Sequence, residues 1–184
     1  MALAPRRWAA ELLHFWFHRL TPHDWWGGCD MVDRELEKRF RRELEALSDM
    51  RAEDFCDRPR GALAAVLLFD QVPRNIFRGS PRAFAFDPLA QDIANMALDR
   101  GFAEALPRRE APFLAMPLMH SEHIADQQRA LHMFRQLDGG ASFAFARSHH
   151  RMIARFGRFP HRNAMLGRKS TPAEERAVAA GFSW

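Results

Sequence analysis

The chain has 184 residues and 47% of them are hydrophobic, which excludes a disordered chain and predicts one globular domain, residues 1–184, with a buried core. The apolar run at residues 12–17 is too short to cross a bilayer and no cleavage pattern follows it, so we predict a cytoplasmic protein without membrane contact. The net charge of +4 and the isoelectric point of about 10.0 favour anionic partners.

The basic residues are almost all arginine, and their placement is uneven. Of the 27 Lys and Arg residues only Lys38 and Lys169 are lysines, so the chain is arginine-rich. Residues 139–173 contain no Asp or Glu, although seven basic residues fall there: Arg147, Arg151, Arg155, Arg158, Arg162, Arg168 and Lys169. A segment of one charge sign attracts a phosphate, a carboxylate, nucleic acid or an acidic partner.

The sequence pattern of the first half of the chain predicts helices. Proline at a first-turn position and inward apolar spacing predict a helix over residues 5–19, and Asp30 is placed to cap a second helix whose apolar stripe covers 32–47. A third helix begins near residues 57–59. It is apolar on all sides over 62–69, which is typical of a central buried helix, and we expect Pro73 to stop it.

The second half continues this pattern. Asp87 with the following proline opens a helix that Gly101 closes, and residues 107–116 fit a short helix. We expect one long helix over 117–137, ended by glycines 139–140, and another over 142–156 with Gly157 after its end. Thr171 and Glu174 form a capping box that starts a last helix. Strand patterns are scarce, so we predict an all-α fold of antiparallel helical hairpins on short loops.

Histidines on the apolar faces of two predicted helices point to a pocket. His120 falls on the inward face of the 117–137 helix, and His149 falls in the middle of the inward face of the 142–156 helix. These two and His161 are candidates for one site, with Glu122 or Asp126 orienting an imidazole for general acid–base work.

Arginines and other polar residues extend this candidate site. Arg158 and Arg162 are suited to hold a carboxylate or phosphate in a bidentate fork. We interpret the stripe of Arg147, Arg151 and Arg155 as a solvated face, and Asp70 with Arg74 or Arg78 as a buried structural pair. Each histidine taken alone also fits an ordinary core residue.

Other site classes lack their patterns. The set His120, Glu122, His123 and Asp126 has suitable residue types for a metal but no strong metal-binding spacing, so we predict no metal and no cofactor. No Gly-rich phosphate loop and no Ser or Cys nucleophile motif is present, and Cys29 and Cys56 are expected to be free thiols. No recognised nucleic-acid module is present, which disfavours nucleic acid as a partner.

Several long polar motifs resemble one family. They are FWF at 15–17, DQVPRNIFRG at 70–79, PLMHSE at 117–122 followed by DQ at 126–127, His149, RFGRFPHRN at 155–163 and LGRKST at 166–171. Together they resemble the domain of unknown function 924 (DUF924), a family placed among tetratricopeptide-like helical proteins. The resemblance implies a right-handed superhelix or bundle of helical hairpins and no established activity. His123 departs from the family pattern, which counts against it as a site residue.

The resemblance also extends the set of candidate site residues. We assign catalytic roles to His120, Glu122 and His149. Ligand-binding roles go to Arg74, Asn75, Gln127, Arg155, Arg158, His161, Arg162, Asn163 and Arg168. The leading hypothesis is a pocket that binds a small anionic molecule, with or without acid–base catalysis. The alternative is a tetratricopeptide-like adaptor that binds an acidic peptide or protein, in which the polar motifs lock helix packing.

Overall fold

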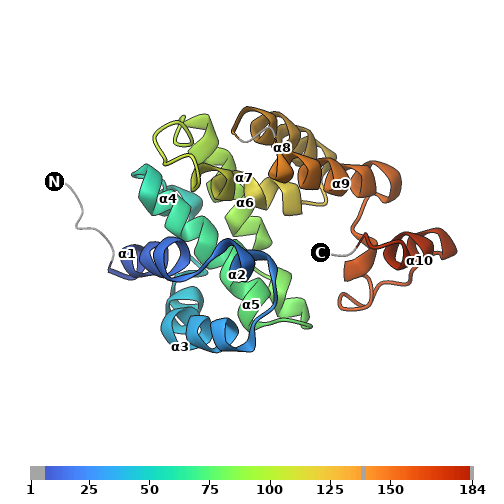
Figure 1. Ribbon diagram of the computed structural model, residues 1–184, viewed down its shortest axis with the longest axis horizontal. Coiled ribbons are helices and arrows are strands. Elements are labelled where there is room, and N and C mark those ends of the chain that lie inside the picture. Colours follow the sequence, from blue (N-terminus) through green and yellow to red (C-terminus); the bar gives the residue numbers. More distant parts are fainter. Residues whose placement is uncertain (1–6, 138–139, 183–184) are drawn as a thin grey trace.

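A computed structural model describes residues 7–137 and 140–182, and within them the chain is helical with no strand (Figure 1). The α-helices are α1 (Arg7–His14), α2 (Pro22–Trp26), α3 (Asp30–Leu47), α4 (Pro59–Val66), α5 (Val72–Ile76), α6 (Asp87–Asp99), α7 (Ala111–His120), α8 (Ile124–Leu137), α9 (Ala141–Phe156) and α10 (Pro172–Ala179). Short π- or 3-10-helical turns lie between them: η1 (Phe15–Arg19), η2 (Ala52–Phe55), η3 (Leu67–Gln71), η4 (Pro81–Phe84) and η5 (Pro160–Arg162). The predicted all-α class is confirmed.

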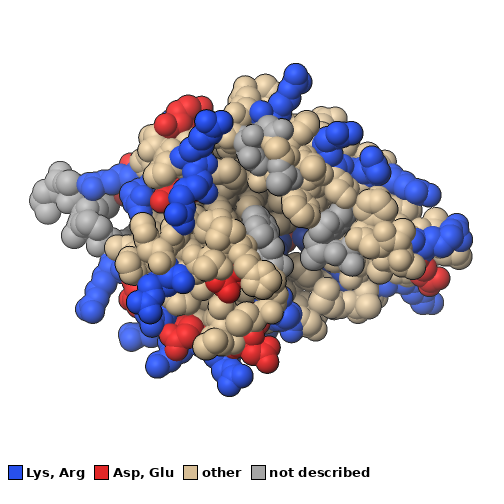
Figure 2. Space-filling model, viewed as in Figure 1, with Lys and Arg blue, Asp and Glu red and all other residues tan. Residues whose placement is uncertain are grey.

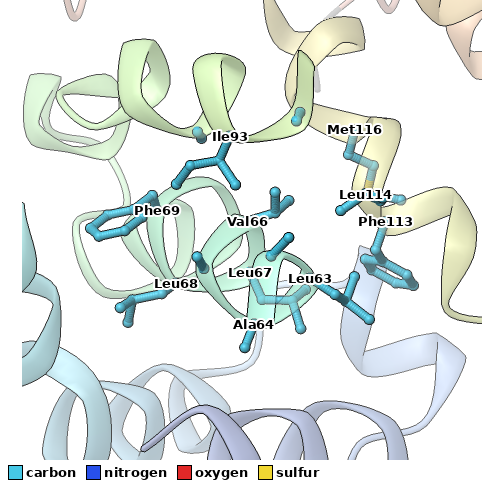
Figure 3. Close-up of a cluster of buried hydrophobic side chains, with 14 of the residues drawn as sticks. Leu63, Ala64, Val66, Leu67, Leu68, Phe69, Ile93, Phe113, Leu114 and Met116 are labelled. Carbon is cyan, nitrogen blue, oxygen red and sulfur yellow. The ribbon is translucent and has the colours of Figure 1, made fainter. Parts of the chain in front are cut away.

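Helix α4 is at the centre, as the sequence predicted. Residues 62–69 have no exposed surface, and α1, α6 and α7 pack around α4. Figure 2 shows charged side chains spread over one face of the surface, whereas Leu63, Val66 and Leu67 meet Ile93 and Leu114 in the interior (Figure 3). Helices α6 to α9 each pack against the next, as expected for hairpins on short loops. The right-handed superhelix stays a prediction.

Pro73 does not stop the third helix, so that expectation is wrong. The chain widens into the π-helical turn η3, in which the backbone N–H of Val72 donates to the carbonyl of Leu67, and it then continues into α5. Pro73 falls in the first turn of α5, where the missing N–H costs little. Asp70 and Arg74 therefore lie on one continuous helical segment, four residues apart.

The long helix predicted for residues 117–137 is also wrong, because two helices share that segment. Helix α7 includes Pro117 and ends at His120, and Ser121 has extended backbone angles. The Ser121 hydroxyl donates to Asp126 at 2.7 Å and accepts from the backbone N–H of His123 at 3.1 Å, which fixes the turn into α8. His120 is therefore at a helix C-terminus, separate from the residues of α8. The glycine pair expected to end this segment includes residue 139, which lies outside the described residues.

The C-terminal segment forms a second, smaller apolar cluster beside the main core. Gly157 ends α9 with φ of +69°, as its sequence position predicted, and the Thr171–Glu174 capping box starts α10. The cluster consists of Met152, Ile153, Phe159 and Ala177. In Figure 1 α10 lies to one side of the bundle, joined to it through α9. This arrangement brings residues 159–165 against the side of the main core.

Two further expectations concern the cysteines and the membrane. Cys29 and Cys56 are both free, and burial raises the pKa of the Cys56 thiol to about 11. Among the helices of the described residues, none combines the length and the apolar content needed to cross a bilayer.

Candidate functional site: a histidine and arginine cavity

A cavity of about 200 Å³ lies where the end of α7, the middle of α9, the turn η4 and the segment after Gly157 meet. The residues that line it are Arg74, Arg78, Gly79, Ala83, Phe84, His120, His149, His161, Arg162 and Met165. The structure thus brings together the three histidines predicted for one pocket, along with Arg74 and Arg162. None of the lining side chains is acidic.

A buried carboxylate holds His120 in place. Asp70 has no exposed surface, and its two oxygens lie 2.8 and 3.0 Å from Nδ1 of His120. Asp70 also accepts from Nε2 of Gln71 at 2.6 Å and lies 3.1 Å from Nη1 of Arg74. Burial alone raises the pKa of Asp70, but Arg74 and His120 outweigh it and lower that pKa well below its usual range. His120 therefore donates from Nδ1 to a charged partner, which leaves the lone pair on Nε2.

A second carboxylate connects two arginines of the lining. Asp87 accepts two hydrogen bonds from Arg74, at 2.8 and 3.0 Å, and one from Nη1 of Arg162 at 3.4 Å. Arg162 is 6% exposed, and its Cζ lies 4.5 Å from the ring centroids of both Phe84 and Phe159. The two aromatic faces stabilise the cation, but they do not replace its hydrogen bonds.

Arg162 is the least compensated charge in the cavity. Its Nε is buried without a hydrogen-bond partner among the described residues, and its only ion pair is the long one to Asp87. Burial, followed by the neighbouring charge of Arg74, lowers the pKa of Arg162 to about 10. Arg74 differs: burial opposes its charge, but Asp70 and Asp87 raise its pKa. An additional anion next to Arg162 would therefore be favoured.

Burial favours the uncharged form of all three imidazoles in this cavity. Burial, and then the charge of His120, lowers the pKa of His149 to about 3, and burial with the charge of Arg162 lowers the pKa of His161 to about 4. Burial also lowers the pKa of His120, although Asp70 opposes this. Nδ1 of His149 donates to the carbonyl of Phe145 at 2.8 Å, so its lone pair is also on Nε2. The rings of His120 and His149 are 6.0 Å apart.

Comparison with known proteins identifies the family. The sequence pattern of the family described as "Bacterial protein of unknown function (DUF924)" matches residues 12–181. The chain belongs to the DUF924 family. A solved structure of a protein of unknown function from Agrobacterium tumefaciens is similar to this chain at 36% sequence identity and a TM-score of 0.88, covering 94% of this chain and 97% of the other. A search of proteins with curated functions gives no match.

Several of the residues assigned from the DUF924 motifs lie outside the cavity lining. Glu122 accepts from the backbone N–H of Phe159 at 2.8 Å and from Nη1 and Nη2 of Arg168 at 2.7 and 2.9 Å. Arg168 also donates to the carbonyl of Phe159. These contacts occupy the carboxylate of Glu122 and join the C-terminal segment to the end of α7. The arrangement favours a structural role for Glu122 and Arg168 in this DUF924 chain, in place of the catalytic and binding roles assigned to them.

Gln127 and Asn163 are also occupied by structural contacts. Gln127 has no exposed surface, and its amide donates to the carbonyls of Met119 and Ser121, both at 2.7 Å, which caps the end of α7. Asn163 is fully buried and donates to the hydroxyl of Ser170 at 3.0 Å. Neither side chain lines the cavity. Both amides stabilise turns that carry cavity residues.

Ligand-binding roles were also assigned to Arg158, Arg155 and Asn75, but none of them lines the histidine and arginine cavity. Arg158 forms a bidentate pair with Glu174 of α10, and the hydrogen bonds from Arg158 and from the Thr171 backbone lower the pKa of Glu174 to about 2. Arg155 is exposed on the outer face of α9, in a separate groove. Asn75 donates to the carbonyl of Gln71 and lines a neighbouring cavity.

Sequence reasoning missed the two carboxylates and the two aromatic rings of the site. Asp70 was interpreted as a structural partner of Arg74, which it is, but it also orients His120. Asp87 was interpreted only as the start of α6. One signal was present: Asp70 directly follows the fully apolar run at residues 62–69, and a lone carboxylate in a buried helix requires a partner. Within residues 7–137 and 140–182 no group of three or more His, Cys, Asp or Glu side chains is placed to hold a metal ion.

Proposed function

We propose that the protein binds a small molecule through a phosphate or carboxylate group next to Arg162, and that His120 acts on that molecule as a general base. The observation that carries the proposal is the incomplete pairing of Arg162, which is 6% exposed and has a buried Nε without a partner among the described residues. Leaving a buried donor unpaired costs roughly 1–3 kcal/mol, and an anionic ligand removes that cost.

The proton chemistry follows from the pair formed by Asp70 and His120. A carboxylate on Nδ1 of a histidine fixes its tautomer, orients the ring and stabilises the imidazolium that forms when Nε2 takes a proton. The ring of His149 lies 6.0 Å from that of His120, measured between the ring centroids. The cavity thus combines fixed positive charge with uncharged bases, which suits removal of a proton from a bound anion.

Loss of Arg162 should reduce the stabilisation that such a ligand gives. We expect a phosphorylated or carboxylated metabolite at a hundred times its dissociation constant to add about 2.7 kcal/mol to the free energy of unfolding, a rise of roughly 5–10 °C in Tm. Arg162→Ala should weaken binding at least about tenfold, because a charge-assisted hydrogen bond is lost. A thermal-shift screen followed by calorimetry measures both effects.

The matched control is Arg151→Ala, which removes the same charge from the exposed face of α9. It should leave the ligand-induced shift unchanged. Arg162→Lys tests the geometry at constant charge, since an ammonium cannot form the guanidinium fork. A screen in which no phosphate or carboxylate stabilises the wild-type protein contradicts the proposal, as does equal binding by wild type and Arg162→Ala.

A basic groove on α9 favours a second candidate, an adaptor for an acidic peptide. The groove measures about 480 Å³ and is lined by Leu131, Arg147, His150, Arg151, Ala154 and Arg155. Within the described part of the chain, none of these three arginines forms an ion pair. On the face in Figure 2 basic side chains gather over α9 with no acidic side chain among them.

If the adaptor hypothesis holds, a fluorescent Glu-rich helical peptide should bind this groove, measured by fluorescence anisotropy. Arg151→Glu should weaken binding at least about tenfold, because it turns an attraction into a repulsion, and raising the salt concentration should weaken it further. Arg162→Ala is the control and should bind the peptide normally. Absence of peptide binding at low salt excludes this candidate.

A further inference from the structure

A second cavity adjoins the first and has a different chemistry. It measures about 340 Å³ and shares four lining residues with the histidine and arginine cavity: Arg74, Arg78, His120 and His149. Its remaining lining is largely apolar, from Trp25, Met116, Met119 and Phe145, with Gly27, Gln71, Asn75 and Ser142. The two cavities therefore share a boundary that includes both imidazoles and both arginines.

The apolar residues of the second cavity are suited to contact a ligand. Phe145 is 47% exposed, an unusual exposure for a large aromatic side chain, and it lies in this lining. The indole N–H of Trp25 donates to the carbonyl of Trp16 at 2.9 Å, which fixes the orientation of the ring. Met116 and Met119 are buried and carry flexible, polarisable thioethers that adapt to the shape of a ligand.

The polar residues of the second cavity already have partners within the protein. The amide of Gln71 donates to Asp70 at 2.6 Å. The amide nitrogen of Asn75 donates to the carbonyl of Gln71 at 2.9 Å, and its oxygen accepts from Arg78 at 3.2 Å. This cavity therefore offers mainly apolar contact area, whereas the first cavity offers charge.

We propose that the ligand is amphipathic: its anionic group occupies the cavity beside Arg162, and an apolar or aromatic group occupies the cavity between Trp25 and Phe145. This proposal rests on the proposed function and names its substrate class. The volume of the second cavity, about 340 Å³, agrees with this proposal. A protein cavity of about 150 Å³ accommodates a benzene ring, so the second cavity has room for one or two rings. The part of the ligand that joins the two groups then lies beside His120 and His149, which line both cavities.

Pairs of probes that differ only in an aromatic ring test this proposal. Inorganic phosphate is compared with phenyl phosphate, and acetate with phenylacetate, by titration calorimetry on the full chain. We expect the phenyl derivative of the anion that binds to bind at least about tenfold more tightly than the anion alone, because the ring leaves water for an apolar surface. Phe145→Ala should reduce this ratio at least threefold and change the affinity for the inorganic anion or acetate less than twofold.

The matched control is Ile124→Ala. Ile124 is 43% exposed, similar to Phe145, but it is not part of either lining. This variant should keep the wild-type ratio, and circular dichroism confirms that both variants fold. Binding of phosphate or acetate without any gain from the ring overturns the amphipathic ligand and leaves anion binding intact. Failure of all four probes to bind overturns the proposed function and this inference together.

Discussion

Asp70→Ala should lower the free energy of unfolding by about 3–5 kcal/mol, because it leaves three partners without their buried carboxylate. Asp70 has no exposed surface and contacts Gln71, Arg74 and His120. Arg74 keeps its bidentate pair with Asp87, so the larger cost falls on the orientation of His120 and on the remaining charge of Arg74. Urea unfolding at neutral pH measures the loss, and thermal unfolding should show a fall in Tm of roughly 10 °C.

The matched control is the exposed ion pair between Asp33 and Arg78. Arg78 donates to Asp33 from Nε at 3.1 Å and from Nη2 at 3.0 Å, and the side chain of Arg78 is 52% exposed. Water screens such a pair, and Asp33→Ala should cost no more than about 1 kcal/mol. If Asp70→Ala were no more destabilising than Asp33→Ala, the buried carboxylate would not be the centre of the site's structure.

The ends of several helices could be predicted because the signals that set them are local. Gly157 ends α9 since a left-handed residue is required there, and Thr171 with Glu174 starts α10 through bonds that span three residues. The apolar run at residues 62–69 predicted a central helix for a similar reason, since a helix without a polar face can only be buried.

Helix continuity could not be predicted in the same way. Periodicity over residues 117–137 fits one long helix as well as two helices, and the break depends on the Ser121 hydroxyl and the Gln127 amide replacing helical hydrogen bonds. Pro73 was expected to end a helix, but the π-helical turn before it absorbs the change in register. In both cases the outcome depends on side-chain and packing choices that periodicity does not encode.

The residues that line the candidate site could be predicted better than the partners with which they pair. His120 and His149 could be predicted for one cavity because each is an imidazole on an apolar helix face, and Arg162 because it lies in an acid-free segment. Their partners lie far away in sequence: Asp70 is 50 residues from His120, and Asp87 is 75 residues from Arg162. Most of the polar motif residues form hydrogen bonds that stabilise turns, because buried backbone groups also need hydrogen-bond partners.

The wild-type protein should lose stability as the pH falls from 7 to 5, and His149→Asn should remove a large part of that loss. An unfolded histidine takes up a proton near pH 6.5, whereas burial in the fold lowers the pKa of His149 to about 3. Between these two values the unfolded state binds more protons, so stability falls with pH. For His149 alone the loss from pH 7 to pH 5 is about 2 kcal/mol.

Asparagine is the informative replacement, because its amide can donate to the carbonyl of Phe145 as Nδ1 of His149 does. His161, whose pKa is lowered to about 4, contributes in the same direction in both proteins and cancels in the comparison. This pH window lies above the ordinary pKa values of carboxylates, so their titration adds little. Urea unfolding at pH 7 and pH 5 measures how much unfolding free energy each of the two proteins loses between these pH values. Equal losses in the wild type and in His149→Asn would mean that His149 accepts a proton within the fold, and the cavity would then carry an additional positive charge at mildly acidic pH.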